Sequence, residues 1–226
     1  MFQNFIDILA APTAAFERLK TAPSFWFPLV LVMVCIASIQ VGYLLLTDFN
    51  FLLDQMVDQA LASNPNARES EVRAAMENVS PTMLATSASV ASMIIVPLIS
   101  ALYATYLNFV SKFGNPEYSF KHWFSLSCWT GIPTLFVAAA AWAVILGSAN
   151  GQVPQAALQP LSLDSLLALN SGKNIWQSLN LPAFWSFALL TLGYRHFTGK
   201  SLSKSATITL APYALVYGIW ALASLL

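Results

Sequence analysis

The chain has 226 residues, of which 57% are hydrophobic and 9% are charged, whereas an ordinary soluble domain carries roughly 25% charged residues. Ten basic and ten acidic residues give a formal net charge of zero, so an attraction of the whole chain to nucleic acid or to an anionic surface has no support. A soluble globule of this size could not bury so much apolar surface. The composition therefore indicates a protein embedded in membrane lipid.

The first part of the chain, residues 1–24, shows an amphipathic pattern that Pro12 interrupts. Its apolar side chains recur at helical spacing: Phe2, Phe5, Ile6, Leu9, Phe16 and Leu19. Asp7 and Glu17 stand where a cleavable signal peptide has a basic start and an unbroken apolar core, so we expect no such peptide. We predict a cytoplasmic amphipathic N-terminal segment on the inner membrane face; a frayed terminus is the alternative.

The rest of the chain, residues 25–226, contains uncharged stretches long enough for the ~20 residues that a helix needs to cross about 30 Å of hydrocarbon. Four of them are unambiguous: 25–47, 82–110, 123–147 and 205–226. A fifth, 175–194, is also uncharged but has Gln177, Asn180 and Pro182 near its start. We therefore predict an all-α protein, a polytopic membrane helical bundle with five transmembrane helices.

The placement of charge predicts the orientation, because cytoplasmic flanks collect lysine and arginine. With five crossings, the N-terminus and the loops 111–122 and 195–204 lie on one side, where the basic residues are Arg18, Lys20, Lys112, Lys121, Arg195, Lys200 and Lys204. The other side holds three basic residues against seven acidic ones. We expect the N-terminus in and the C-terminus out. Without the fifth span, the loop 195–204 would change sides and the asymmetry would be lost.

The two loops on the outer side each contain a helical pattern. In the loop 48–80, two apolar patterns separated by Asn64 and Pro65 predict a small acidic helical hairpin. In the loop 148–174, Ser162 is placed to cap a short helix that rests on the interface.

Residues for catalysis or proton transfer are missing from the spans. The five spans contain no Asp, Glu, Lys, Arg or His, although an ionisable group in hydrocarbon is the usual mark of a pump or a proton relay. Cys35 and Cys128 lie within apolar runs and read as small hydrophobic residues, and His122 and His196 read as polar anchors at the interface. We expect no enzyme activity, no cofactor and no metal site.

Proline and small residues mark the spans. Pro97, Pro133 and Pro212 lie deep enough to kink their helices, either as hinges or as ordinary bends. The last span carries a stripe of small residues suited to close helix packing: Ala211, Ala214, Gly218 and Ala221. Serine and threonine side chains within the spans serve either helix packing, which we favour, or a polar cavity.

Several short motifs, in this order, carry a family resemblance. Phe113-Gly114 is followed by Ser119-Phe120 and Gly131-Ile132-Pro133, and the stretch 179–215 contains Gly199-Lys200-Ser201 and Ala211-Pro212-Tyr213. From about Pro23 to its end, the chain resembles the Yip domain family, most strongly its bacterial members. The resemblance implies five spans, a cytosolic N-terminus and self-association. Eukaryotic members bind Rab GTPases, but this chain lacks an Asp-Leu-Tyr-Gly-Pro motif, so Rab binding is not carried over. A bacterial cytoplasmic membrane is the expected location.

Two functions remain open on the sequence alone. The first is a non-enzymatic, self-associating scaffold or adaptor, whose basic inner loops contact lipid headgroups or another membrane protein through Lys112, Lys121, Arg195, Lys200 and Lys204. The alternative is a transporter or channel for a neutral or lipidic solute, suggested by the deep prolines and the serine and threonine faces. An intramembrane enzyme is the least favoured.

Overall fold

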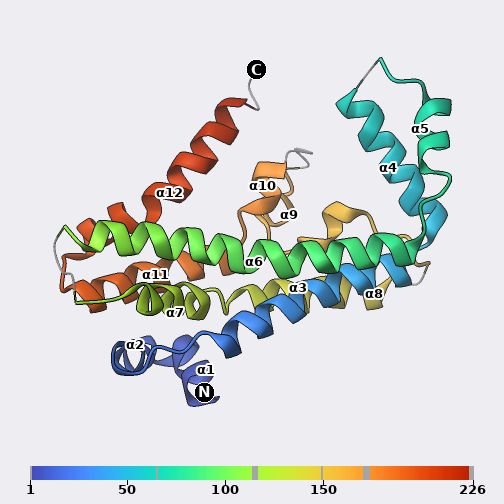
Figure 1. Ribbon diagram of the computed structural model, residues 1–226. Coiled ribbons are helices and arrows are strands. Elements are labelled where there is room, and N and C mark those ends of the chain that lie inside the picture. Colours follow the sequence, from blue (N-terminus) through green and yellow to red (C-terminus); the bar gives the residue numbers. More distant parts are fainter. Residues whose placement is uncertain (1, 65, 114–116, 149, 170–173, 224–226) are drawn as a thin grey trace.

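A computed structural model describes residues 2–64, 66–113, 117–148, 150–169 and 174–223. Regular structure in these ranges is helical (Figure 1), apart from one isolated β-bridge between Ser162 and Asn180. The helices are α1 (Phe2–Ala10), α2 (Pro12–Thr21), α3 (Trp26–Leu46), α4 (Phe49–Ser63), α5 (Glu69–Met76), α6 (Pro81–Ser111), α7 (Phe120–Thr130), α8 (Thr134–Gly147), the 3₁₀ turn η1 (Gln155–Leu158), α9 (Leu163–Leu166), α10 (Asn174–Ser178), α11 (Leu181–Thr198) and α12 (Leu202–Ala223).

Four helical segments are long and apolar enough to cross a membrane. They are α3, α6, the α7–α8 pair taken together, and α12. α6 is 31 residues long, or about 46 Å at 1.5 Å per residue, and α3 runs along it (Figure 1). These helices confirm the prediction of an all-α membrane protein and match four of the five predicted spans.

The predicted span 123–147 is not one continuous α-helix. α7 ends at Thr130 and α8 begins at Thr134, with tight i→i−3 bonds between them, such as the amide of Thr134 to the carbonyl of Gly131 at 3.0 Å. Pro133 lacks an amide hydrogen and its ring disfavours a regular helix on its N-terminal side. The break therefore follows from the proline, and the two halves together form the crossing segment.

The predicted fifth span, 175–194, also differs from the structure. α10 ends at Ser178, and α11 starts at Leu181 and extends to Thr198. The side chain of Asn180 caps α11 by accepting a hydrogen bond from the amide of Ala183 at 2.9 Å, which explains the new start. α11 thus includes two ionisable residues in its last turn, and it is not among the four helices that meet the criteria for crossing.

α1 and α2 form a hairpin that packs against α7 and α11. Pro12 occupies the first position of α2, where its missing amide hydrogen costs little. Only part of the apolar face seen in the sequence is buried in this contact: Ile8, Phe16 and Leu19 are almost fully enclosed, whereas Phe2 and Ile6 are exposed. The N-terminal hairpin is therefore part of the folded bundle.

α4 and α5 form a second hairpin at the opposite end of the bundle (Figure 1). Asp48 caps α4, its carboxylate accepting from the amides of Asn50 and Phe51 at 2.8 and 3.1 Å. The segment after α8 folds back over this end, where the hydroxyl of Tyr43 donates to the carbonyl of Val153 at 2.9 Å.

The main hydrophobic core lies where α1, α2, α6, α7 and α11 meet. Its largest fully buried side chains are Trp123, Trp129 and Tyr194, and aromatic contacts extend from them to Phe27 and Phe197. By contrast, most large apolar side chains in the C-terminal half of α12 are exposed, as on a surface that lipid covers.

Candidate lipid-binding site at the basic end of the bundle

The five basic residues singled out in the sequence belong to helix ends that the fold brings together. Figure 1 shows that α6 ends, α7 begins, α11 ends and α12 begins at the same end of the bundle, which we call the basic end. The five residues are Lys112 after α6, Lys121 in α7, Arg195 in α11, Lys200 between α11 and α12, and Lys204 in α12. Lys200 is half-buried and the other four are exposed.

These five cations differ from the other basic residues in their ion pairing. In the α4–α5 hairpin, Arg73 contacts Asp54 at 2.9 Å and Glu69 at 2.8 Å, and in the α1–α2 hairpin Arg18 pairs with Asp7. Within the part of the chain that the structure describes, none of the five has a carboxylate at ion-pair distance. The basic end therefore carries positive charge that the fold does not neutralise.

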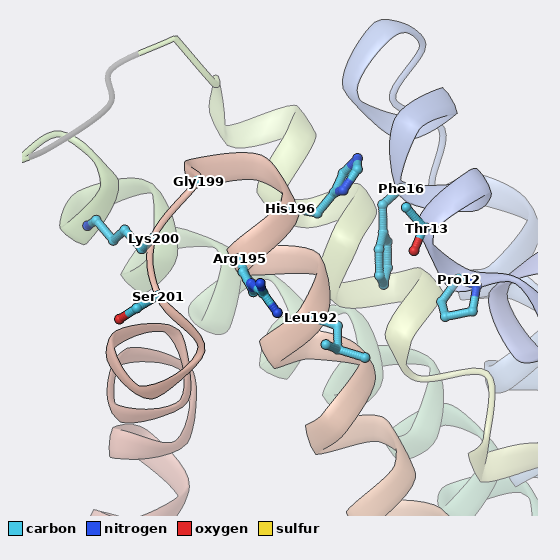
Figure 2. A pocket seen from close by; sticks show the side chains of 9 residues that line it. All are labelled: Pro12, Thr13, Phe16, Leu192, Arg195, His196, Gly199, Lys200 and Ser201. Carbon is cyan, nitrogen blue, oxygen red and sulfur yellow. The ribbon is translucent and has the colours of Figure 1, made fainter.

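A cavity of about 530 Å³ opens at the basic end between α2 and α11. Figure 2 shows its lining, which comes from α2 (Pro12, Thr13, Phe16), from α11 (Leu192, Arg195, His196) and from the turn into α12 (Gly199, Lys200, Ser201). We call it the α2–α11 cavity. Two of the five unpaired cations line it, so it is a polar and basic cavity.

The turn between α11 and α12 depends on Gly199, which ends α11, and on Ser201, which precedes α12. Gly199 ends α11 with a φ of +66°, and its amide donates to the carbonyl of Arg195 at 2.8 Å, a left-handed cap that favours glycine. Ser201 then caps α12, since its carbonyl accepts from the amide of Ser205 at 3.0 Å. This turn places Lys200 so that its ammonium donates to the hydroxyl of Tyr194 at 3.4 Å.

The α2 wall of the cavity is attached to α11 by two contacts. The ring of Phe16 lies against Gly193, where an added Cβ would come within 3.0 Å of it. Nε2 of His196 lies 2.7 Å from Oε2 of Glu17. This hydrogen bond, with Lys20 nearby, holds the pKa of Glu17 below its usual range. The sequence contains no signal for a pair 179 residues apart, and His196 reads there only as an interfacial anchor.

His122 has a structural partner in its own helix. Its Nδ1 accepts a hydrogen bond from the amide of Ser119 at 3.3 Å, at the start of α7. The two cysteines, Cys35 and Cys128, are not disulfide-bonded, and Cys128 is buried. Among the described residues, no group of three or more His, Cys, Asp and Glu side chains could hold a metal ion.

The other residues chosen from the sequence lie away from the basic end. Pro97 and Pro212 lie inside α6 and α12. On α12, Ala211, Ala214 and Gly218 are exposed and Ala221 is half-buried. A Cβ added at Gly218 would find no atom of the described chain within 4 Å, so this part of the small-residue stripe is not packed against another described helix.

The hydroxyl groups along α6 are mostly satisfied within their own helix. Ser87, Ser89 and Ser92 donate to carbonyls three or four residues earlier, at 2.8 to 2.9 Å. Between helices, the buried hydroxyls of Thr191 and Thr209 lie 2.8 Å apart and join α11 to α12. These bonds favour helix packing as the role of the serine and threonine residues.

A helical chain with several segments able to cross a bilayer and a basic cluster at one end is a multi-pass integral membrane protein. Residues 6–225 match the family model described as the Yip1 domain. The match covers nearly the whole chain, so the protein belongs to the Yip1 family, as the resemblance in its motifs predicted. No curated protein and no solved structure matches the chain.

Proposed function

We propose that this Yip1 family protein is a non-enzymatic, self-associating scaffold or adaptor that holds anionic lipid at the cytoplasmic face of its membrane. The observation that carries the proposal is the basic end, where five cations gather without a carboxylate partner in the described chain. Each such cation contributes about 1 kcal/mol beside an anionic leaflet. A family that is not known for catalysis supports a role without a reaction.

The proposed topology has five crossings, with the N-terminus in and the C-terminus out, in a bacterial cytoplasmic membrane. α11 is the added crossing, and its 18 residues span about 27 Å, close to the thickness of the hydrocarbon core. The separation of charge supports this orientation, because the acidic α4–α5 hairpin lies at the opposite end from the basic cluster (Figure 1).

Self-association is proposed through α12. The outer half of this helix exposes Leu215, Val216 and Ile219 beside the unpacked Gly218. In lipid, small residues on an open face let two helices approach closely. The proposed contact therefore joins the α12 helices of two copies.

The proposed function is tested by crosslinking and by lipid analysis of the protein extracted from native membranes. We expect crosslinked oligomers, and anionic phospholipid retained above its share of the bilayer. Substituting glutamine for all five cations of the basic end should remove the retained lipid while the crosslinks persist. Monomers alone, together with lipid retained in bulk proportion, would contradict the proposal.

The topology is tested separately with reporters fused before Met1 and after Leu226. Five crossings place the two reporters on opposite faces of the membrane. A third reporter inserted after Asn150 should share the face of the C-terminal one. Both terminal reporters on one face would rule out the odd number of crossings.

A transporter or channel for a neutral or lipidic solute is the second candidate. A cavity of about 630 Å³ runs along the outer part of α6, lined by hydroxyl and apolar side chains, among them Thr82, Thr86 and Val90. Liposome flux measures this directly. Transport above that of empty vesicles, reduced by Pro97→Ala or Pro133→Ala, would favour the transporter over the scaffold.

A further inference from the structure

The α2–α11 cavity has a lining that suits a phosphate group. Arg195 offers a planar set of donors that matches phosphate oxygens, and it has no ion-pair partner in the described chain. Figure 2 shows its guanidinium between Ser201 on one side and Pro12 and Thr13 on the other. The hydroxyls of Thr13 and Ser201 add donors on both sides.

The helix ends that border the cavity contribute partial charges of both signs. The N-terminal ends of α2, at Pro12 and Thr13, and of α12, which Ser201 precedes, carry partial positive charge, which favours anions. The C-terminal end of α11, at Gly199, carries partial negative charge, so the side chain of Arg195 is the main source of positive charge. The carboxylate of Glu17 does not line the cavity and is bound to His196. Among the described residues, no negative side chain lines the space.

The surroundings favour a lipid over a free anion. Leu192 lines the cavity and is 38% exposed, and Leu202, which follows Ser201, is 50% exposed. An apolar flank continuous with a crossing helix suits an acyl chain, whereas a free phosphate would gain nothing from it. Basic cavities between membrane helices on the cytoplasmic side are places where anionic headgroups bind.

We propose that the α2–α11 cavity is a specific binding site for the phosphate of an anionic phospholipid, with Arg195 as its main ligand and α2 as one of its walls. This site rests on the proposed lipid-holding function and narrows it from a diffuse basic surface to one pocket. The contact of Glu17 with His196 holds α2 against α11, so headgroup binding and docking of the α1–α2 hairpin stabilise each other.

The test compares single charge losses at the basic end. Arg195→Gln removes the central ligand, while Lys121→Gln and Lys204→Gln remove the same charge from exposed positions outside the cavity. In nanodiscs containing phosphatidylglycerol, we expect Arg195→Gln to weaken retention of that lipid about tenfold or more. Each lysine control should weaken it by about fivefold at most. Equal losses in all three variants would overturn the pocket but leave the diffuse basic surface standing.

A site-specific measurement uses phenylglyoxal, which modifies arginine side chains. The modified positions are mapped on peptides of the wild-type chain. Phosphatidylglycerol discs should protect Arg195 severalfold relative to phosphatidylcholine discs. Arg68, whose side chain is 81% exposed, should react alike in both and serves as the internal control. Equal protection of Arg195 in both kinds of disc would overturn selectivity for the anionic headgroup.

A third measurement distinguishes a phospholipid from free inorganic phosphate as the occupant of the cavity. Inorganic phosphate added to the protein in detergent without phospholipid should leave Arg195 reactive. Full protection by inorganic phosphate would assign the cavity to a free anion and overturn the lipid as occupant. If phosphatidylglycerol is not retained by the wild-type chain at all, the proposed function fails together with the pocket.

Discussion

The core around α7 and the C-terminal half of α12 are stabilised by different surroundings. Along α7, the indoles of Trp123 and Trp129 are fully enclosed by protein, and the ring nitrogen of Trp129 donates to the carbonyl of Ser24 at 2.7 Å. On α12, Trp220 is 38% exposed and stacks on its helix neighbour Tyr217. The comparison teaches that the same residue type serves as core in one region and as a lipid-facing surface in the other.

The largest expected effect comes from removing a core indole of α7. Trp129→Ala should lower the free energy of unfolding by about 3 to 5 kcal/mol, which is roughly 10 °C in melting temperature for a chain of this size. Trp220→Ala, the matched change on α12, should cost less than about 1 kcal/mol. Thermal unfolding in detergent measures both. Similar losses from the two variants would erase the distinction between the regions.

The next largest effect is expected from adding one methyl group at Gly42. Gly42 packs against Trp142, and an added Cβ would overlap the indole ring. Gly42→Ala should force the ring away from Ser38, to which its nitrogen donates at 3.2 Å, and destabilise the protein by about 1 to 3 kcal/mol.

The matched control for Gly42 is Gly218→Ala on α12. No atom of the described chain lies within 4 Å of its added Cβ, and alanine is the better helix former by up to about 1 kcal/mol. The two substitutions should therefore shift the melting temperature in opposite directions. A loss of stability from Gly218→Ala in monomeric detergent particles would show that α12 packs within the chain.

Acidification is expected to loosen the attachment of α2 to α11. Because the pKa of folded Glu17 lies below its usual value of 4.5, the folded state binds a proton less readily than the unfolded state. The contact is therefore fully present above that value and is lost as the pH falls through the lowered pKa. The protection factors of the α2 amides, which compare the measured exchange rate with the intrinsic rate at the same pH, should fall from about pH 6 to about pH 3. α3, which contains no acidic residue, serves as the reference.

Glu17→Gln should remove most of this pH dependence and leave α2 partly exchanged throughout the range. Glu117→Gln, at an exposed position near the basic end, is the control. If Glu17→Gln and the wild type show the same pH profile in α2, the contact with His196 does not hold the hairpin.

The smallest effect is expected in the α4–α5 hairpin. Arg73→Gln removes the exposed pairs with Asp54 and Glu69, and such surface pairs contribute little to stability. The loss should disappear in high salt, because exposed charges are screened. Protease sensitivity between α4 and α5 at low and high salt measures it. A loss that persists in salt would point to packing by the arginine stem.

Hydrophobic length and charge made much of this architecture predictable. Four uncharged stretches correspond to helices able to cross a membrane, because apolar length is a local property of the chain. The boundaries of α11 were harder to predict from the sequence, since Asn180 acts as an N-cap and moves the start of the helix. At Pro133 the sequence predicted a kink, but the structure has a break, because the turn around Pro133 separates α7 from α8.

The candidate site was predictable only in part. Arg195 and Lys200 stand out in the sequence as basic residues of a predicted inner loop, but their cavity depends on α2. Its wall rests on Phe16 against Gly193 and on Glu17 beside His196. Contacts between the two ends of a chain leave no periodic pattern, so only the folded structure brings them together.

The attachment of α2 to α11 also determines when, during synthesis, the fold can be completed. The residues that meet there are 179 positions apart, so α2 completes its contacts only after α11 has been synthesised. Until then the face of α2 that contacts α11 has to rest on the bilayer surface or on a chaperone. Ribosome-bound chains that stop after α8 should therefore expose α2 to protease, and chains that include α11 should protect it.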